Sequence, residues 1–530
     1  MGNIEPKKKS RFKKNIDVLK LPKKTYKTAK KIAKKGLSKS NLALASGLDI
    51  FLEKEIGVRK QFFGFLNFIP HKIRKYSKIL FPLALMFLIL KWDLPIPIDI
   101  KKAFALFICI GLLWGLESLP MVVTAIMVPV LIVLLGLGNQ TEALSSFSNP
   151  VIYLLFGGLI LAVAFRKNGL DRRFAFKLLS LSGGDSKKIL FYFMLSSAVL
   201  GMWMSNTATV ALLVPIAISI SSYIKKEDNK KFISVLILCI GIGSSIGGMS
   251  AITGSTPNAI TSAFINENNI FSFSQWMQIG VPISVICFMS AYFLLINMFK
   301  IKSKNIIENS KEFFKIDEPL TYNQKKTIAI FLPTIIFWIF GKDIAIYFNL
   351  NPNIFSSTIV SLIAVIFLFS VKIISWSDAR SIAWEVLLLI GGGLALGKVL
   401  INTGASKLFS DFILSYFTGI HPLIVLMVIM YMAIFLANFV NNSSTVIILV
   451  PTLMALGDSM NLSPIMLALA VAHAVALSFI TPISIPAFSI IYSTHLVDRK
   501  DMIKSGLIIG FINTIIVSFI LILYSTWRGF

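Results

Sequence analysis

Two short groups of hydroxyl and amide side chains interrupt long apolar stretches of this sequence. Ser205-Asn206-Thr207 lies midway along residues 188–222, and Asn441-Asn442-Ser443-Ser444 lies midway along residues 420–457. Hydroxyl and amide N–H groups donate hydrogen bonds to an oxyanion, and carbonyl oxygens coordinate hard cations. Neither group contains a charged side chain. They are therefore candidates for reversible binding of an anion and a small cation; the alternative is that they only join two helices.

Each group is followed by a second break in an apolar segment. Gly247-Gly248-Met249-Ser250 and Gly254-Ser255-Thr256-Pro257-Asn258 interrupt residues 231–268, and Thr481-Pro482-Ile483-Ser484-Ile485-Pro486 interrupts residues 462–493. Proline removes a backbone donor and leaves a carbonyl without its helical partner. An unwound segment at membrane depth exposes carbonyls suited to Na⁺. A proline kink without a ligand is the other interpretation of either break.

The elements that position these groups must be membrane helices. The chain has 530 residues, of which 55% are hydrophobic and 15% charged, whereas soluble domains are about 45–50% apolar and about 25% charged. Many apolar runs are long enough, or nearly so, to cross a hydrocarbon core about 30 Å thick. This composition excludes soluble enzymes, disulfide-rich secreted proteins and fibrous proteins. The 3 cysteines and 4 histidines have no metal-ligand spacing, so a zinc site is not expected.

We expect an all-α polytopic membrane protein with about eleven transmembrane helices and two re-entrant hairpins. The hairpins are residues 188–222 and 420–457, because a polar tip at membrane depth is tolerated only when it is buried in protein or lines a wet cavity. The remaining apolar runs give spans near residues 79–92, 103–118, 120–138, 150–166, 231–268, 275–299, 324–346, 354–375, 383–401, 462–493 and 503–526.

The second half of the chain repeats the first. Gly157-Gly158-Leu159 aligns with Gly392-Gly393-Leu394 at an offset of 235 positions, and the two polar tips align at an offset of 236. An odd number of spans separates the two glycine-rich helices, so the copies must run in opposite directions. Inverted-topology repeats are common in secondary transporters, with the substrate near the membrane midplane between the copies.

These patterns divide the chain into regions. We expect a basic cytoplasmic N-terminal region at 1–78, a first span and connection at 79–102, a first inverted repeat at 103–299, a cytoplasmic linker at 300–323 and a second inverted repeat at 324–526.

The net charge of +27 is concentrated before the first span, where residues 1–78 hold 22 Lys and Arg against 5 Asp and Glu. The positive-inside rule places the N-terminus in the cytoplasm and, with eleven spans, the C-terminus outside. Residues 7–39 are either a solvated tail or an anchor to anionic lipid, where each Lys or Arg contributes about 1 kcal/mol. Nucleic acid is not an expected partner, because only Phe12 and Tyr26 could stack within this stretch.

In these motifs the chain resembles the divalent anion/sodium symporter (DASS) family of dicarboxylate, citrate and sulfate carriers. The resemblance covers residues 103–526. It includes Trp114-Gly115-Leu116-Glu117-Ser118-Leu119-Pro120 with Thr124 and Pro129, the paired Gly-Gly-Leu helices, the first Ser-Asn-Thr tip and the Gly-Ser-Thr-Pro-Asn break. It implies a homodimer in the cell membrane, with a scaffold and an elevator-type transport part in each protomer, and no enzyme activity.

The resemblance also implies which residues bind. The anion would contact Asn206, Thr207, Ser255, Asn442 and Ser443. A first Na⁺ would be held by Ser205, Asn206 and Gly254, and a second by Asn442 with the carbonyls of Val440 and Ser484.

The second copy departs from the family pattern. Its tip reads Asn441-Asn442-Ser443 instead of Ser-Asn-Thr, and Ile485-Pro486-Ala487-Phe488 replaces the second Thr-Pro-Pro-Asn. A hydroxyl and an amide are lost, and one hydrogen bond to a charged ligand is typically worth about 1.5–3 kcal/mol. This puts the second Na⁺ site in question and points to a different anion, a different coupling ion or exchange without sodium.

The function expected from the sequence is Na⁺-coupled secondary transport of a small dianion, with C4-dicarboxylates such as succinate and malate as the first candidates. Neither tip carries a Lys or Arg, so bound cations would offset the charge of the dianion. Sodium-independent dicarboxylate exchange and sulfate or citrate transport stay open. Glu117 is either a buried structural acid or a participant in ion linkage.

Two other classes fit less well. A membrane-embedded enzyme would need a nucleophile with a base, or a metal cluster, but His473 has no acidic or cysteine neighbour at helical spacing. Broken helices can line a channel, but paired hairpins in inverted repeats favour alternating access.

Overall fold

The computed structural model describes residues 71–221, 226–268, 271–304, 306, 318–417, 419–460, 462–482 and 484–528. Lys75–Tyr492 and Leu496–Phe530 form one compact unit, to which the description below applies. Residues 1–70, with the proposed lipid anchor at 7–39, and half of the predicted linker at 300–323 lie outside the described residues.

The described residues are helical and contain no strand, which confirms the all-α fold class. The first series of helices is α4 (His71–Lys91), α5 (Ile98–Gly115), α6 (Met121–Leu134), α7 (Gln140–Ser145), α8 (Pro150–Lys167), α9 (Leu170–Leu179), α10 (Ser186–Trp203), α11 (Asn206–Ser221), α12 (Lys226–Gly248), α13 (Thr256–Asn268) and α14 (Phe273–Phe299). The second series is α16 (Tyr322–Tyr347), α17 (Ser357–Ser370), α18 (Trp376–Ala379), α19 (Trp384–Asn402), α20 (Ala405–Phe417), α21 (Pro422–Phe439), α22 (Asn442–Met460), α23 (Pro464–Ala476), α24 (Pro486–Ser493) and α25 (Arg499–Arg528).

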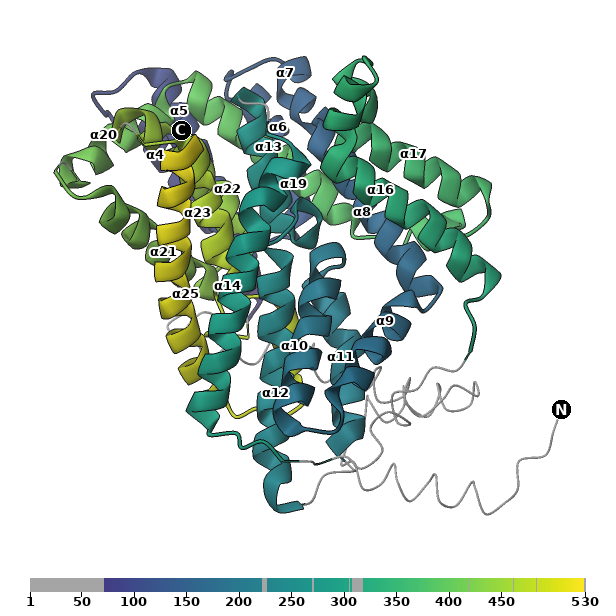
Figure 1. Cartoon of the computed structure of the whole chain (residues 1–530). Coiled ribbons are helices and arrows are strands. Elements are labelled where there is room, and N and C mark those ends of the chain that lie inside the picture. The colour runs from purple at the N-terminus through teal and green to yellow at the C-terminus, as the bar shows by residue number, and fades with distance from the viewer. Residues whose placement is uncertain are drawn as a thin grey trace. The chain divides into compact units, whose positions relative to one another are not determined.

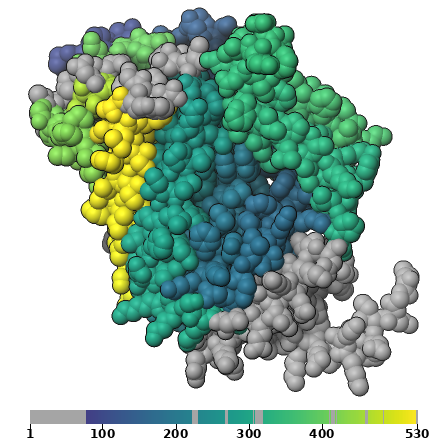
Figure 2. All heavy atoms as spheres, viewed as in Figure 1, coloured from purple at the N-terminus to yellow at the C-terminus, as the bar shows by residue number. Residues whose placement is uncertain are grey.

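Within the described residues, 7 helical segments are long and apolar enough to cross a membrane: Gln140–Lys167, Lys230–Gly248, Phe273–Phe299, Tyr322–Tyr347, Trp384–Asn402, Pro422–Phe439 and Arg499–Thr526. Their outer faces carry large apolar side chains. Figure 2 shows α14 and α25 side by side at the surface, where Phe293, Phe511 and Phe519 are more than half exposed. Apolar surface of this kind suits contact with lipid rather than water.

Each polar tip lies at a break between two helices. Met204 separates α10 from α11 with an extended backbone (φ −123°, ψ 158°), and Val440 separates α21 from α22 in the same way (φ −112°, ψ 168°). Asn206 and Asn442 are therefore the first residues of the second helix in each pair. Both α10 and α11 pack on α12 (Figure 1), and both α21 and α22 pack on α23.

The order of helices from α5 to α14 recurs from α16 to α25, and contacts between the two series are reciprocal. α6 packs on α19, and its counterpart α17 packs on α8, the counterpart of α19. The glycines of the Gly-Gly-Leu motifs lie at both contacts. A Cβ at Gly157 would be 2.5 Å from the Ser361 Cβ, and one at Gly392 would be 2.5 Å from the carbonyl oxygen of Ala125. Small residues thus let these helices approach closely.

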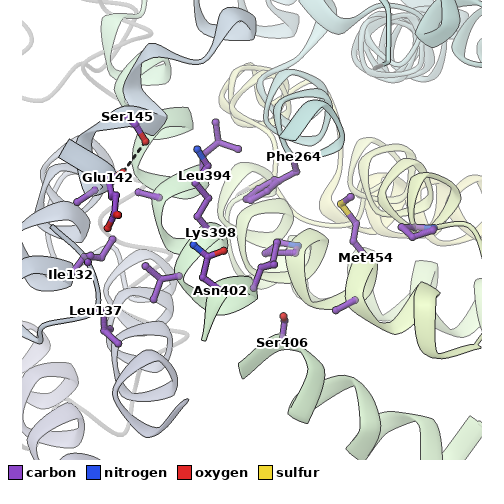
Figure 3. Close-up of a pocket in the computed structure, with 18 residues that line it drawn as sticks. Ile132, Leu137, Glu142, Ser145, Phe264, Leu394, Lys398, Asn402, Ser406 and Met454 are labelled. Atoms are coloured by element: carbon purple, nitrogen blue, oxygen red, sulfur yellow. Dashed lines mark hydrogen bonds between the residues drawn. The ribbon is translucent and has the colours of Figure 1, made fainter. Parts of the chain in front are cut away.

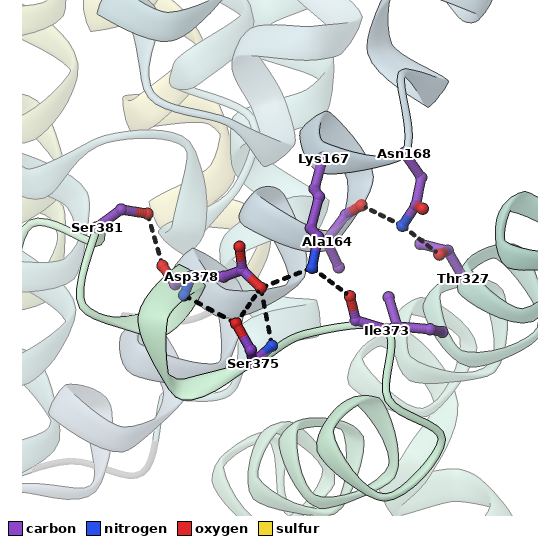
Figure 4. Close-up of polar contacts among 8 residues, drawn as sticks. All are labelled: Ala164, Lys167, Asn168, Thr327, Ile373, Ser375, Asp378 and Ser381. Carbon is purple, nitrogen blue, oxygen red and sulfur yellow. Dashed lines mark hydrogen bonds and ion pairs between the residues drawn. The ribbon is translucent and has the colours of Figure 1, made fainter.

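A polar corner holds the end of α8 (Figure 4). The Lys167 ammonium donates to Asp378 Oδ2 at 2.6 Å and to the carbonyl of Ile373 at 3.0 Å, and the Asn168 amide donates to the Thr327 hydroxyl at 3.0 Å. The hydrogen bond from Lys167 lowers the pKa of Asp378 to about 2. Ser375 completes a capping box with Asp378. The corner joins α8 to α16 and to the segment that leads into α18.

Candidate functional site

The first tip is held by a serine of the broken helix beside it. The Ser244 hydroxyl on α12 lies 3.2 Å from Asn206 Oδ1 and 3.3 Å from the Asn206 carbonyl oxygen, both acceptors. Gly248, the last residue of α12, faces the same amide, and a Cβ there would be 3.0 Å from Asn206 Oδ1. The break after α12 and the tip of the first hairpin are therefore direct neighbours, as the sequence pattern requires if they form one site.

The first break is a short ordered loop. The Asn258 amide donates to the carbonyls of Gly248 and Ala251, both at 2.8 Å. A Cβ at Gly254 would be 2.4 Å from the Gly248 carbonyl oxygen, so only glycine fits there. Ser255 is extended (φ −151°, ψ 151°), and its buried hydroxyl has no hydrogen-bond partner among the described residues. Buried polar groups are nearly always paired, so this hydroxyl is suited to bind a ligand.

The second tip repeats the arrangement of the first. The Asn442 amide nitrogen donates to the Val475 carbonyl at 2.7 Å, and the Ser478 hydroxyl donates to Asn442 Oδ1 at 3.1 Å. The backbone N–H of Ser443 donates to Asn441 Oδ1 at 2.8 Å. In both copies, therefore, the asparagine that begins the second hairpin helix accepts a bond from a serine next to the helix break.

The second break is held differently from the first. Phe488 occupies the position of Asn258, and its buried ring stacks on Phe479 with centroids 5.6 Å apart. The loop is tied to α21 instead, because Asn438 Oδ1 accepts from the backbone N–H groups of Ile480 (3.2 Å) and Thr481 (3.1 Å). Ser484 closes the turn by donating to the carbonyls of Ser478 (2.6 Å) and Thr481 (2.8 Å). The departure at Ile485-Pro486-Ala487-Phe488 thus leaves an ordered break.

The two copies meet where α12 contacts the end of α23. The Ser245 hydroxyl donates to the Ala476 carbonyl at 2.7 Å. Its neighbour Ser244 contacts Asn206, and the neighbour of Ala476, Val475, contacts Asn442. Asn206 and Asn442 are therefore connected where α12 contacts α23, through three hydrogen bonds and the adjacent residues Ser244-Ser245 and Val475-Ala476.

The remaining predicted residues lie at or next to helix ends. Ser205 is exposed, and its hydroxyl accepts from the Ala208 N–H at 3.3 Å. Thr207 is half-buried in the first turn of α11. Val440 lies next to α5, since a Cβ at Gly115 would be 3.9 Å from Val440 Cγ2. Glu117 adopts a left-handed backbone (φ 43°) in the turn after α5.

Sequence reasoning missed four residues of this site: Ser244, Ser245, Asn438 and Ser478. Each is a small polar residue in or next to an apolar helix, two or three positions before a break or tip that the sequence did locate. Their closeness to a break was the one feature of the sequence that could have marked them as part of the site. Serine in an apolar helix usually bonds its own backbone, so the type alone does not reveal a partner on another helix.

The arrangement suits an anion and a cation together. The N-terminal ends of α11 and α22 begin at the tips, and that of α13 begins after the first break. Helix N-termini carry partial positive charge and unpaired N–H groups that favour anions. Loop carbonyls between the helices provide oxygen ligands for a small cation.

The fold defines a class, the polytopic α-helical membrane proteins built on broken helices and hairpins. The structure resembles the YdaH transporter of Alcanivorax borkumensis (TM-score 0.50, 13% identity, 73% of this chain and 87% of that one). It also resembles MtrF of Neisseria gonorrhoeae (TM-score 0.52, 12% identity, 86% and 95%).

Within that class, the chain belongs to the sodium:sulfate symporter family, whose transmembrane region matches residues 73–529. An uncharacterised transporter of Haemophilus influenzae is 33% identical over 439 residues, which are 82% of this chain and 94% of the relative. The sodium-dependent dicarboxylate transporter SdcS of Staphylococcus saprophyticus is 28% identical over 474 residues, 84% and 90% of the two chains. The resemblance inferred from the sequence motifs is confirmed.

Proposed function

We propose that this protein is a secondary transporter of the cell membrane that couples uptake of a small dianion to Na⁺, with succinate and malate as the first candidates. The observation that carries this proposal is the pair of matching contacts, Asn206 with Ser244 and Asn442 with Ser478, on either side of one helix crossing. Membership of a sodium-coupled family, with relatives named as dicarboxylate transporters, supports the coupling ion and the substrate class.

The dianion binds, on this proposal, between the two tips. Asn206, Thr207 and Ser255 contact it from the first copy, and Asn442 and Ser443 from the second. The buried hydroxyl of Ser255, which has no partner among the described residues, supports this assignment. Hydrogen bonds from neutral groups let the anion leave again, which a transport cycle requires.

The first Na⁺ binds at Ser205, Asn206 and Gly254. The described geometry suits it, because Asn206 Oδ1 and the Gly254 carbonyl oxygen lie on the same side of Gly248, 3.0 and 3.3 Å from where its Cβ would be. A second Na⁺ binds at the Asn442 amide oxygen with the carbonyls of Val440 and Ser484. That amide oxygen also accepts from the Ser478 hydroxyl, so the ion shares it with this hydrogen bond.

The halves are an inverted repeat at 103–299 and 324–526, on this proposal, with the N-terminus cytoplasmic and the C-terminus outside. The reciprocal contacts of α6 with α19 and α8 with α17 support it. The glycine-mediated contacts belong to a scaffold that stays rigid in a homodimer, and the two hairpins with their broken helices move as an elevator. The corner at Lys167 then lies inside, and α7 and α20 lie outside.

Sodium-independent exchange of dicarboxylates, or transport of sulfate or citrate, is the second candidate. It is favoured by Phe488, whose buried ring replaces an amide in the second break. An exchanger moves one dianion in and another out in each cycle and needs no net uptake of Na⁺. It therefore tolerates the loss of Na⁺ ligands at the second break.

The test is Asn206→Ala, since this amide serves both the anion and the cation. The variant should lose Na⁺-driven uptake of labelled succinate in proteoliposomes while inserting normally into the membrane. Asn353→Ala, on an exposed position between α16 and α17, is the matched control and should transport as the wild type does. Normal transport by Asn206→Ala would show that the site assignment is wrong.

A further inference from the structure

A cavity of about 540 Å³ lies apart from the hairpin tips, between α6, α7, α13, α19, α20 and α22 (Figure 3). Sites for small molecules commonly enclose about 300–1,000 Å³. Its polar lining consists of Glu142, Ser145, Lys398, Asn402 and Ser406. None of these residues belongs to the site described above.

Two helices lead from the candidate site to this cavity. α13 begins just after Ser255 and reaches the cavity at Phe264, and α22 begins at Asn442 and reaches it at Met454. At a rise of 1.5 Å per residue, these helices place the cavity roughly 13 Å from Ser255 and roughly 18 Å from Asn442. Both copies of the repeat therefore connect the binding region to the cavity.

Lys398 is an unusual residue for its position. It is half-buried on α19, whereas the residues from Leu389 to Leu400 are otherwise buried and uncharged. Ionisable residues within membrane spans are rare and usually functional. Figure 3 shows Lys398 and Asn402, one helical turn apart, on the wall of the cavity, with Glu142 on the facing wall.

Glu142 is fixed in place by its own helix. Its Oε2 accepts from the backbone N–H of Asn139 at 3.1 Å, and its N–H donates to Asn139 Oδ1 at 2.9 Å, which forms a capping box at the start of α7. The cavity thus presents one positive and one negative charge from opposite walls. Their effects on a passing ion must be opposite in sign.

We propose that the cavity is the access vestibule for the dianion on the outer side, with Lys398 attracting the substrate, Asn402 offering it a hydrogen bond and Glu142 limiting how tightly it is held. Charged clefts with low-dielectric walls concentrate ions of opposite sign. The assignment of the outer side and of a dianionic substrate rests on the proposed function.

A thiol probe tests the charge of the cavity without any assumption about the substrate. The sequence has 3 cysteines, all buried, so Asn402→Cys introduces one accessible thiol. Its rate of modification from outside is measured with an anionic and with a cationic methanethiosulfonate reagent. Lys398→Gln should lower the anionic-to-cationic rate ratio about tenfold, because a unit charge roughly 6 Å away acts oppositely on the two reagents. Glu142→Gln keeps an oxygen that can accept the capping bond from the Asn139 N–H, and it should raise the anionic-to-cationic rate ratio.

Uptake kinetics then test whether the substrate uses this route. Because succinate carries two negative charges, Lys398→Gln should raise its KM about tenfold with little change in kcat. Lys398→Arg should restore the wild-type KM, and Glu142→Gln should lower the KM. Lys407→Gln is the control, since Lys407 is exposed on α20 and does not line the cavity.

Three results would overturn the vestibule: no modification of Asn402→Cys from outside, as expected if lipid fills the cavity; shifts of the same sign in Lys398→Gln and Glu142→Gln; or an unchanged KM in Lys398→Gln. A wild-type protein that transports no dianion would instead refute the proposed function, and the thiol ratios would still report on the cavity.

Discussion

Replacement of either motif glycine by alanine should force apart a pair of helices that connects the two halves of the protein. The added Cβ would lie 2.5 Å from Ser361 Cβ in Gly157→Ala, and 2.5 Å from the Ala125 carbonyl oxygen in Gly392→Ala. Carbon atoms pack at about 3.5–4.0 Å, so each helix pair would have to separate by about 1 Å. The obstacles are backbone atoms or a Cβ, which cannot rotate away.

The size of the effect follows from two opposing contributions. Overpacking of a close contact costs about 1–3 kcal/mol, and replacement of a helical glycine by alanine contributes about 1 kcal/mol in the favourable direction. Each variant should therefore be destabilised by up to about 2 kcal/mol. Gly111→Ala is the matched control, because its Cβ would meet only the Ile448 side chain at 3.7 Å. That variant should be as stable as the wild type, or more so.

Reversible unfolding of the purified protein in detergent, followed by tryptophan fluorescence, measures these differences. Destabilisation of Gly157→Ala and Gly392→Ala by similar amounts, with Gly111→Ala unaffected, would support the reciprocal packing of α8 on α17 and α19 on α6. If all three variants were equally stable, the helices would not approach as closely as described, and the packing account would be refuted.

Three further predictions concern the site and the corner. Ser244→Ala and Ser478→Ala each remove one hydrogen bond to a tip asparagine, worth about 1 kcal/mol, and should raise the KM for anion uptake about fivefold; unchanged KM values would exclude a positioning role for the serines. Asn438→Ala leaves two backbone N–H groups of the second break without their acceptor and should lower the stability to unfolding by about 2–3 kcal/mol; a wild-type stability would mean that the loop is held by other contacts. Asp378→Asn removes the ion pair with Lys167. Because the pKa of Asp378 is lowered to about 2, the wild type should be more stable than the variant above about pH 4. This difference in stability should vanish as the pH falls toward 2. Since the pair is partly exposed, the difference at pH 7 should not exceed about 1 kcal/mol, and a pH-independent difference would contradict this cause.

The sequence was sufficient to locate the parts of the site. Polar or glycine-rich groups inside apolar runs have few explanations at membrane depth, so Asn206, Asn442 and the break at Gly254 could be assigned to helix ends before any coordinates. The all-helical membrane class followed from the composition and the length of the apolar runs, and the family followed from the order of these motifs.

The contacts that hold the site could not be predicted in the same way. A serine such as Ser244 or Ser478 has the same local pattern whether it bonds its own helix or a neighbour, because the partner depends on how helices cross. The replacement of an amide by Phe488 indicated a damaged second break, whereas the structure supplies Asn438 from another helix in compensation. The Gly-Gly-Leu motifs revealed the repeat, but their packing role depends on Ser361 and Ala125, more than 200 positions away.

Uptake of labelled succinate into proteoliposomes tests the central claim most directly. An inward Na⁺ gradient is compared with a K⁺ gradient of the same ionic strength, without internal substrate, and then with internal succinate and no Na⁺. The proposed function predicts accumulation driven by the Na⁺ gradient alone, abolished in Asn206→Ala. Uptake that needs internal succinate and ignores Na⁺ would contradict sodium coupling and identify an exchanger, and failure to transport succinate, malate, sulfate or citrate under either condition would contradict the dianion site itself.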